Sequence, residues 1–446
     1  MSSAFLKHPF MSQHAIAACD DDATVRAMLA FELALAEVQE ASGAVPNGAS
    51  QQMREQLEHA SFNVAEIAEG IASGGNMAIP FVKQSRALLA EDLKRYWHQG
   101  ATSQDVVDSA LMLLLKPRLA ALNELLLRCR SAATALMDAH IATPMVGRTL
   151  MQQALPITFG VKVAHWAIGL EQARRRLSSV ELPVQFGGAV GVHSGWDVQG
   201  LEWMDALAER LGLAVPVLPW HTDRYPIHAL GTALDGVAGA AEKVALDVSL
   251  LTQTEVGEVA EPSAPGMGES SSMPHKRNPV RSALIRGAAR QVHGHTSVLI
   301  NAAAQPLERG LGEWHAEWAP LMESVLLVEG ALEQLAVLLE GLEVNPANMQ
   351  RNLAATGGGI MAEPVARLLT PTLGADNAKA VSAAAAETSR LESRPYFEVL
   401  LDVLAGHPEV KGSVDADALR NACNPALYLG SSAAQVERAK KWLAGE

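Results

Sequence analysis

The chain has 446 residues, enough for two or three domains or one elongated body, and 49% of them are apolar, which is ample for a large core. Its formal net charge of −14 argues against nucleic acid as a partner, because phosphate binding needs a basic surface. Aromatic residues make up only 4%, while alanine and leucine are abundant, which favours helices over sheets.

The cysteines and the N-terminal residues indicate the cellular compartment of the protein. Cys19, Cys129 and Cys423 lie far apart, and none is in a spacing typical of a zinc site, so we expect free thiols, no metal and no cofactor. Residues 1–8 contain no long apolar run, which predicts no signal peptide and a cytoplasmic location. No run of about 18 apolar residues occurs, so no membrane span is expected.

Apolar residues at helical spacing predict helices joined by short loops that are rich in glycine and proline. The predicted long helices span residues 22–42, 104–140, 228–259, 280–303 and 315–342. Pro117 lies inside the second helix and should kink it, since the apolar periodicity resumes beyond it. The third contains no proline and would be about 50 Å long if fully helical.

Helices of this length bury their apolar faces by packing as a bundle, and broad apolar faces favour self-association. We therefore predict an all-α protein in three parts. A helical N-terminal domain would occupy residues 1–105, a central bundle of long helices residues 106–350, and a helical C-terminal domain residues 351–446. The last boundary is close to a break of three glycines at residues 357–359.

Four segments stand out from the helical pattern because they combine breakers with polar side chains. The first, residues 98–105, contains His98, Thr102 and Ser103, and Ser103 is a candidate cap for the helix that follows. A helix N-terminus attracts anions, so Thr102 and Ser103 could hold a substrate carboxylate. A simple helix start with an incidental His98 explains these residues equally well.

The second and third segments place arginines and a histidine beside glycine or proline. They are residues 147–160, with the candidates Arg148, Thr149 and Gln152, and residues 219–226, with His221 and Arg224. We expect both to be loops, in which an arginine can bind a carboxylate and a histidine can transfer a proton. Alternatively, Arg148 is a structural ion-pair partner and His221 a hydrogen-bonded surface residue.

The fourth segment, residues 266–279, concentrates the most chemistry. Its glycines and prolines predict a loop, because neither residue suits a helix interior. Ser270 and Ser271 can exchange protons, whereas Lys276 and Asn278 can hold a carboxylate by charge and by hydrogen bonding. A solvated loop could contain any one of these residues, but the whole set indicates a site for proton transfer and carboxylate binding.

Together these segments resemble the fumarase/aspartase superfamily, which includes adenylosuccinate and argininosuccinate lyases. The fourth segment matches its pattern Gly-Ser-Ser-x-Met-Pro-x-Lys-x-Asn-Pro, except that Glu269 replaces the glycine. Residues 98–103 match His-x-Gly-x-Thr-Ser, and residues 147–152 match Gly-Arg-Thr-His-x-Gln except at one position. The resemblance implies an all-helical fold in three parts and a homotetramer whose active sites are shared between subunits.

The resemblance also implies roles for the candidate residues. In the superfamily a loop serine handles the carbon-bound proton, so Ser270 or Ser271 is the first candidate for this step here and His221 the second. Lys276 and Asn278 would bind the carboxylate that takes up the developing charge. The other substrate carboxylates would be held by His98, Thr102, Ser103, Arg148, Thr149, Gln152 and Arg224.

Two departures from the superfamily pattern indicate the kind of reaction. Its lyases usually have a histidine where Leu150 stands and a glutamate where Ala283 stands, and this pair serves the external nucleophile or leaving group. Leucine and alanine cannot transfer protons. A nucleophile that is the substrate's own carboxylate needs neither group, because it is ionised at neutral pH, with a pKa near ~4, and is tethered to the reacting carbon.

One branch of the superfamily catalyses such a reaction, the interconversion of 3-carboxy-cis,cis-muconate and carboxymuconolactone in aromatic degradation. Residues 79–83, 219–222 and 426–430 resemble that branch. The sequence therefore predicts an intramolecular lyase that acts on a small tricarboxylate without a cofactor. An amine-releasing enzyme like adenylosuccinate lyase is the alternative, and it would need a replacement for the missing pair. A non-catalytic structural protein on this scaffold is a further rival, against which the intact Lys276 and Asn278 argue.

Overall fold

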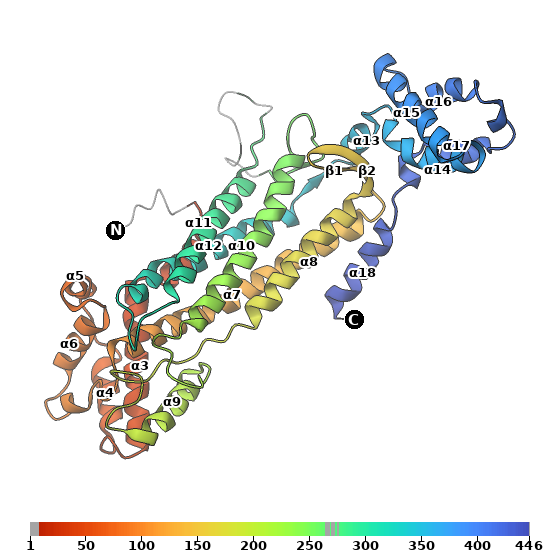
Figure 1. The fold of residues 1–446 in the computed structure, drawn as a ribbon. Helices are drawn as coiled ribbons and strands as arrows, with labels where there is room; N and C mark the ends of the chain where they lie inside the picture. Colours follow the sequence, from red (N-terminus) through yellow and green to blue (C-terminus); the bar gives the residue numbers. More distant parts are fainter. Residues whose placement is uncertain (1–8, 264–267, 269–272, 274–275, 446) are drawn as a thin grey trace. The chain divides into compact units, whose positions relative to one another are not determined.

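The structure is a computed structural model that describes residues 9–263, 268, 273 and 276–445. Helices make up most of this part of the chain and the strands are few and short, as Figure 1 shows, which confirms the all-α prediction. The predictions for Ser270, Ser271 and Glu269 lie outside the described residues. No described helix combines the length and apolar character that crossing a membrane requires.

The α-helices are α2 (Gln13–Ala18), α3 (Asp21–Ala41), α4 (Ala49–Leu57), α5 (Val64–Gly74), α6 (Ala78–Leu88), α7 (Ser103–Ala139), α8 (Phe159–Ser178), α9 (Asp197–Leu211), α10 (Tyr225–Leu251), α11 (Val280–Ala302), α12 (Glu313–Glu340), α13 (Pro346–Ala354), α14 (Ala362–Leu373), α15 (Ala375–Glu392), α16 (Tyr396–Leu404), α17 (Ala416–Ala422) and α18 (Ser432–Ala444). Short 3₁₀ helices are η1 (Lys94–Tyr96), η2 (Gly359–Met361), η3 (Pro408–Val410) and η4 (Pro425–Leu427). The strands are β1 (Pro144–Thr149), β2 (Gln152–Thr158), β3 (Val259–Ala260) and β4 (Glu343–Val344), paired antiparallel as β1–β2 and β3–β4.

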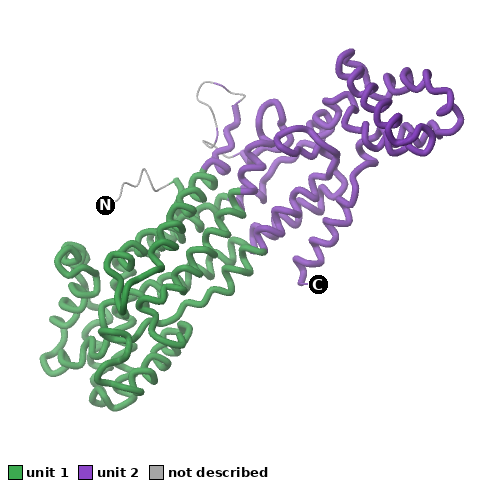
Figure 2. The backbone as a smooth tube through the Cα atoms, viewed as in Figure 1, with its two compact units in different colours: residues 1–126, 172–242, 284–334 green, residues 127–171, 243–283, 335–446 purple. Residues whose placement is uncertain are grey.

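The backbone forms two compact units, coloured separately in Figure 2. The first comprises residues 1–126, 172–242 and 284–334, and the second comprises residues 127–171, 243–283 and 335–446. The unit boundaries fall within long helices, such as α7 between Leu126 and Leu127. The predicted division into three consecutive domains stays a prediction.

The first unit contains the N-terminal helices and a bundle of long-helix segments. Asp20 caps α3 by accepting the Ala23 N–H at 2.8 Å, and one face of this helix is buried, as its apolar spacing predicts. Within the bundle, Arg118 on α7 pairs with Glu329 on α12 at 3.1 Å. In the same unit, α10 and α11 are joined by an ion pair between Asp235 and His293.

The predicted long helices are confirmed to within a few residues, with one exception. Helix α7 begins and ends one residue before the predicted bounds and continues through Pro117. Helix α10 is shorter at its C-terminal end than predicted, because it stops at Leu251 instead of continuing to residue 259. Beyond Leu251 the chain turns through Gly257, whose φ is +57°, and enters β3.

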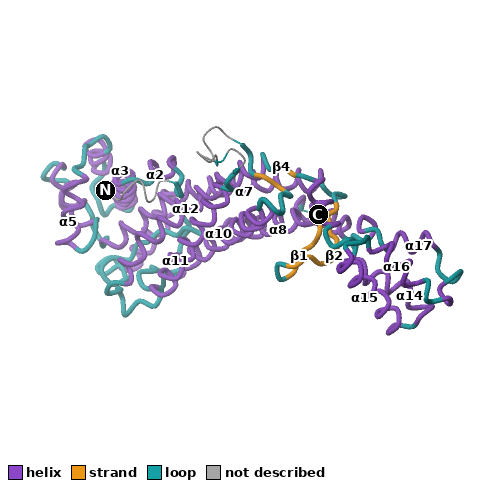
Figure 3. The backbone as a smooth tube through the Cα atoms, turned by 90° about the horizontal axis from the view of Figure 1, so that it is seen from above, coloured by secondary structure: helices purple, strands orange, loops and turns teal. Residues whose placement is uncertain are grey.

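The predicted loop at residues 147–160 is wrong in its secondary structure, because the chain forms the β1–β2 hairpin there (Figure 3). Leu150 and Met151 make the two-residue turn and have φ values of 49° and 65°. Positive φ at both central positions is the geometry of a type I′ turn, which usually takes asparagine or glycine. Leu150 is 96% exposed, so a strained, apolar residue stands at the hairpin tip.

The C-terminal part of the second unit is a cluster of short helices, α14 to α17, around its own apolar core. Val365, Leu369 and Leu400 are fully buried in this core, together with nearly all of Tyr396. The cluster follows the three glycines at residues 357–359, where the structure confirms a break between α13 and α14.

Candidate active site

The predicted site residues, other than Ser270 and Ser271, are all described, and each unit contains some of them. Those in the first unit are His98, Thr102, Ser103, His221 and Arg224. Those in the second unit are Arg148, Thr149, Gln152, Lys276 and Asn278. We describe the two groups separately.

The centre of the first group is Asp105, the third residue of α7, which the sequence analysis did not select. Its carboxylate accepts hydrogen bonds from the backbone N–H groups of Thr102 (2.9 Å), Gly187 (3.1 Å) and Gly188 (2.9 Å). Its Oδ1 also contacts His221 Nε2 at 2.7 Å. Asp105 thus reaches back over the first turn of its helix to the Thr102 N–H, whereas Ser103, the candidate cap, is itself the first helical residue.

His221 is held inside the protein and not at the surface. Its side chain is 4% exposed, and its backbone oxygen accepts a hydrogen bond from Gln104 Nε2 at 2.9 Å. With Nε2 bonded to Asp105, the other ring nitrogen, Nδ1, is buried without a hydrogen-bond partner among the described residues. A Cβ placed on Gly191 would lie 3.4 Å from this nitrogen, so Nδ1 faces a glycine turn.

His98 forms a second pair of histidine and carboxylate. Its Nδ1 lies 2.5 Å from Oε1 of Glu32, whose side chain is fully buried in α3. Burial by itself lowers the pKa of His98, but the charge and hydrogen bond of Glu32 outweigh burial and hold this pKa above its usual value. Because Nδ1 is engaged by Glu32, only Nε2 of His98 remains to donate to a substrate carboxylate, the role predicted for this residue.

The His98–Glu32 pair predicts how stability depends on pH. Because the folded-state pKa of His98 is raised, the stability that the pair contributes is fully present below pH 6.5 and is lost as the pH rises through that folded-state pKa. We expect the urea midpoint to fall over this window in the natural protein and to fall less in Glu32→Gln. The exposed pair of His407 and Glu409 offers a control, since Glu409→Gln should leave the pH slope unchanged. Parallel curves for the natural protein and Glu32→Gln would contradict the prediction.

Arg224 is fully engaged within the protein, which weakens its predicted role as a substrate ligand. It is 2% exposed, and its five N–H groups meet Asp108, Glu317 and the Trp220 backbone oxygen. Burial alone lowers the pKa of Arg224, but the two carboxylates hold it above its usual value. No donor remains for a substrate carboxylate, so Arg224 is the centre of a buried ion cluster.

Arg148 in the second unit is also paired, which favours the alternative of a structural ion pair. Its Nη1 and Nη2 donate to the two oxygens of the buried Glu258 at 3.0 and 2.7 Å. Asn352 adds a further donor to Glu258 at 2.8 Å. Thr149 and Gln152 are exposed and stand opposite each other at the end of the hairpin, where they remain accessible to a ligand.

Lys276 and Asn278 lie at the base of the loop that the sequence singled out. The backbone N–H and Nδ2 of Asn278 donate to the Gly268 oxygen at 3.0 and 3.2 Å. Asn278 thus holds the Gly268 backbone, and its second amide hydrogen is available to a ligand. The neighbouring Arg277 is neutralised by Glu343, with Nη2–Oε1 at 2.8 Å. Lys276 is exposed, which leaves its charge available to an anionic substrate.

Glu261 is another carboxylate that sequence reasoning missed. It accepts the backbone N–H groups of Arg281 and Ser282 at 2.9 and 2.8 Å and the Ser282 hydroxyl at 2.6 Å. Glu261 therefore caps α11 directly after the loop base. Of the missed carboxylates, only Asp105 had a usable signal, its position three residues after Thr102 in a capping pattern.

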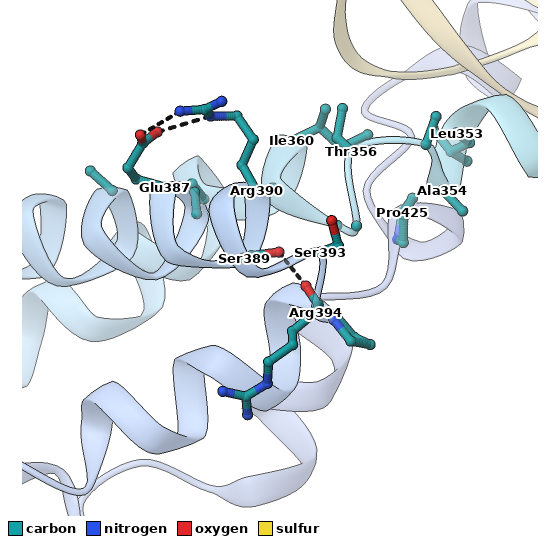
Figure 4. Close-up of a pocket in the computed structure, with 18 residues that line it drawn as sticks. Leu353, Ala354, Thr356, Ile360, Glu387, Ser389, Arg390, Ser393, Arg394 and Pro425 are labelled. Atoms are coloured by element: carbon teal, nitrogen blue, oxygen red, sulfur yellow. Dashed lines mark hydrogen bonds and ion pairs between the residues drawn. The ribbon is translucent and has the colours of Figure 1, made fainter.

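A cavity of about 1180 Å³ in the C-terminal part of the second unit contains none of the predicted site residues (Figure 4). Two of the side chains that line it, Arg390 and Arg394, are cationic, but both are paired. Arg390 bonds Glu387, and Arg394 bonds Glu392 and Asp402. The cavity therefore offers no free cation for a tricarboxylate. Across the part of the chain that the structure describes, no cluster of three or more histidine, cysteine or acidic residues could hold a metal.

Comparisons with known proteins find relatives that match nearly the whole chain. A family model described as Lyase matches residues 10–294. The chain is 40% identical to the 3-carboxy-cis,cis-muconate cycloisomerase of Bradyrhizobium diazoefficiens, with 98% of each protein covered. It is also 39% identical to the nitrosuccinate lyase of Streptomyces davaonensis, over 95% of this chain and 91% of that protein. The solved structure of 3-carboxy-cis,cis-muconate lactonizing enzyme from Pseudomonas putida matches with a TM-score of 0.91 and 38% identity, over 98% of both chains.

Proposed function

The chain belongs to the lyase family of the fumarase/aspartase superfamily, and from this premise we propose that it is an intramolecular lyase that interconverts 3-carboxy-cis,cis-muconate and carboxymuconolactone. The single observation that carries the proposal is the joint absence of the proton-transferring pair. Leu150 and Ala283 stand in its two positions, and neither side chain can exchange a proton. Relatives named for this reaction favour it over the amine-releasing alternative.

The proposed reaction begins when one substrate carboxylate adds to a carbon of the double bond. Negative charge then builds on the neighbouring carboxylate, where Lys276 and Asn278 stabilise it as fixed electrostatic partners. A general acid delivers a proton to the adjacent carbon. The candidates for this acid are the loop serines, Ser270 and Ser271, and His221.

The remaining substrate carboxylates need donors that are not already engaged. Arg148 and Arg224 are held by buried carboxylates, which weakens the case for both as ligands. The donors that support the proposal are His98, Thr102, Ser103, Thr149 and Gln152. His98 is itself paired, because its Nδ1 contacts the buried Glu32, so it can donate to a substrate only through Nε2.

We place the enzyme in the cytoplasm as a homotetramer with active sites shared between subunits. The free thiols of Cys19 and Cys423 support a reducing compartment. The exposed apolar hairpin tip supports a partner surface, because such residues are usually covered in an assembly. Further exposed apolar residues lie along α10 and α11, namely Leu246, Val298 and Ile300.

The activity itself can be tested by ultraviolet absorbance of the conjugated diene. Purified protein at micromolar concentration should remove the 3-carboxy-cis,cis-muconate signal and form the lactone without added metal or cofactor. Nitrosuccinate belongs in the same assay, because a lyase named for it is nearly as similar to this chain as the named cycloisomerases. Loss of nitrosuccinate but not of the muconate would reject the proposed function.

Restoring the missing pair distinguishes a cycloisomerase from an amine-releasing lyase. The double variant Leu150→His, Ala283→Glu should leave muconate turnover within about threefold or lower it, because a carboxylate nucleophile needs neither group. Histidine is among the residues that tolerate positive φ, so the hairpin turn should persist. The two single variants are the matched controls. A gain of activity toward adenylosuccinate, together with loss of muconate turnover, would contradict the cycloisomerase.

A further inference from the structure

The unpartnered Nδ1 of His221 needs an explanation. A buried polar atom without a hydrogen bond costs about 1–3 kcal/mol, and most such atoms in proteins are satisfied. His221 nevertheless has one nitrogen bonded to Asp105 at 2.7 Å and the other bonded to no described residue. The nearby His193 is satisfied in a simpler way, because its Nε2 contacts the Phe186 backbone oxygen at 3.1 Å.

Asp105 fixes which nitrogen of His221 is bonded. The carboxylate of Asp105 accepts three backbone N–H groups, from Thr102, Gly187 and Gly188. These bonds fix the orientation of the carboxylate independently of the imidazole. A carboxylate only accepts hydrogen bonds, and three of its donors are these backbone N–H groups. Nε2 of His221 is therefore the fourth donor to Asp105. Nδ1 is then either the free lone pair of a neutral imidazole or the second N–H of a charged one.

We propose that His221 moves the carbon-bound proton through Nδ1 and that Asp105 is the residue that positions it. This inference rests on the proposed cycloisomerase reaction and assigns one of its open steps. The arrangement has the logic of a histidine oriented by a buried carboxylate, in which the carboxylate selects the tautomer and stabilises the imidazolium. Asp105 itself touches no substrate in this scheme.

Atoms and electrons balance in both directions of this step. In lactone formation a lone pair of the substrate carboxylate forms the C–O bond, and the π electrons move to the adjacent carbon and its carboxylate. The carbon then takes the proton from Nδ1–H of the imidazolium, which becomes neutral. In the reverse direction Nδ1 removes that proton, the C–O bond breaks, and the released electron pair returns to the substrate carboxylate.

Glycines border the edge of the His221 ring that carries Nδ1. A Cβ on Gly187 would lie 3.0 Å from His221 Cε1, and one on Gly191 would lie 3.4 Å from Nδ1. Side chains at these positions would press on the ring edge that carries Nδ1. With glycine at both positions this edge is bordered by backbone and not by side chains, and it is the side from which a substrate carbon would approach the buried Nδ1.

Two substitutions test the pair by kinetics. His221→Gln and Asp105→Asn should each lower kcat by about 10²–10⁴-fold, as general acid–base groups and their orienting carboxylates do, with KM changed less than threefold. In Asp105→Asn the solvent deuterium isotope effect on kcat should increase, because proton transfer becomes slower. His193→Gln is the matched control, a nearby buried histidine that should keep kcat within about threefold.

A spectroscopic measurement tests the pair without turnover. In protein labelled with ¹⁵N-histidine, His221 should show a hydrogen-bonded proton on Nε2 at low field. This signal should disappear in both His221→Gln and Asp105→Asn and persist in His193→Gln. If the natural protein does not turn over carboxymuconate, the proposed function fails. The spectrum then still tests whether Asp105 holds Nε2 of His221.

Three results would overturn the inference. One is a natural kcat in folded His221→Gln or Asp105→Asn. Another is a rise in KM without a fall in kcat, which would make His221 a binding group only. The third is a low-field signal that survives Asp105→Asn, because Asp105 would then not hold Nε2.

Discussion

Replacing Lys276 by methionine is expected to lower kcat for muconate turnover by about 10²–10³-fold, the usual loss when one donor to a developing charge is removed. Lys276 is exposed, whereas the adjacent Arg277 is neutralised by Glu343. Methionine keeps much of the length and apolar stem of lysine while it removes the charge. The loss should appear in absorbance assays at saturating substrate, because the charge builds up only as the C–O bond forms.

The control for this prediction is an exposed lysine elsewhere in the second unit. Lys411→Met makes the same change at the end of η3 and should leave kcat unchanged. Folding is not expected to differ between the two variants, since both side chains are exposed. Unchanged turnover in Lys276→Met would remove this lysine from the mechanism and, with it, the main electrostatic element of the proposed site.

The elements that the sequence predicted well are those that depend on local pattern. Helices α3, α7, α11 and α12 follow from apolar spacing over three or more turns, and their ends lie within two residues of the predicted bounds. The hairpin was missed because its turn residues, Leu150 and Met151, are unusual at a type I′ turn. Such turns are normally recognised in a sequence by asparagine or glycine.

The site was predicted at the level of single residues but not of pairs. His98, Arg148 and His221 were selected because their motifs are local. Their carboxylate partners lie 66, 110 and 116 positions away in the chain, at Glu32, Glu258 and Asp105 respectively. No pattern in one sequence links such positions, so whether a cation is free or already neutralised becomes visible only in the fold.

This pairing changes the expected electrostatics of the site. The two arginines predicted as substrate ligands are both held by buried carboxylates, Arg148 by Glu258 and Arg224 by Asp108 and Glu317. The charge offered to a polyanion then comes chiefly from the exposed Lys276, because His98 is likewise held by a buried carboxylate, Glu32. An acidic protein can thus bind an anionic substrate with few free cations, provided that they are placed locally.

The buried cluster of Arg224 predicts the largest loss of stability from a single substitution. Arg224→Met leaves Asp108 and Glu317 as uncompensated charges at 0% and 2% side-chain exposure. Removal of one partner from a buried ion pair costs about 3–5 kcal/mol. The free energy of unfolding from urea titration should fall by this amount. Arg128→Met breaks an exposed pair with Glu340 and should cost about 0–1 kcal/mol.

A second substitution separates charge from packing in this cluster. If the loss in Arg224→Met comes from stranded carboxylates, the double variant Arg224→Met, Glu317→Gln should lose less than the sum of the two single variants, because one unpaired charge is removed along with the guanidinium. If it comes from lost packing against Trp220, whose ring centroid is 4.7 Å from the guanidinium carbon, the losses should add. Additive losses, or equal costs for Arg224→Met and Arg128→Met, would contradict an electrostatic role for the cluster.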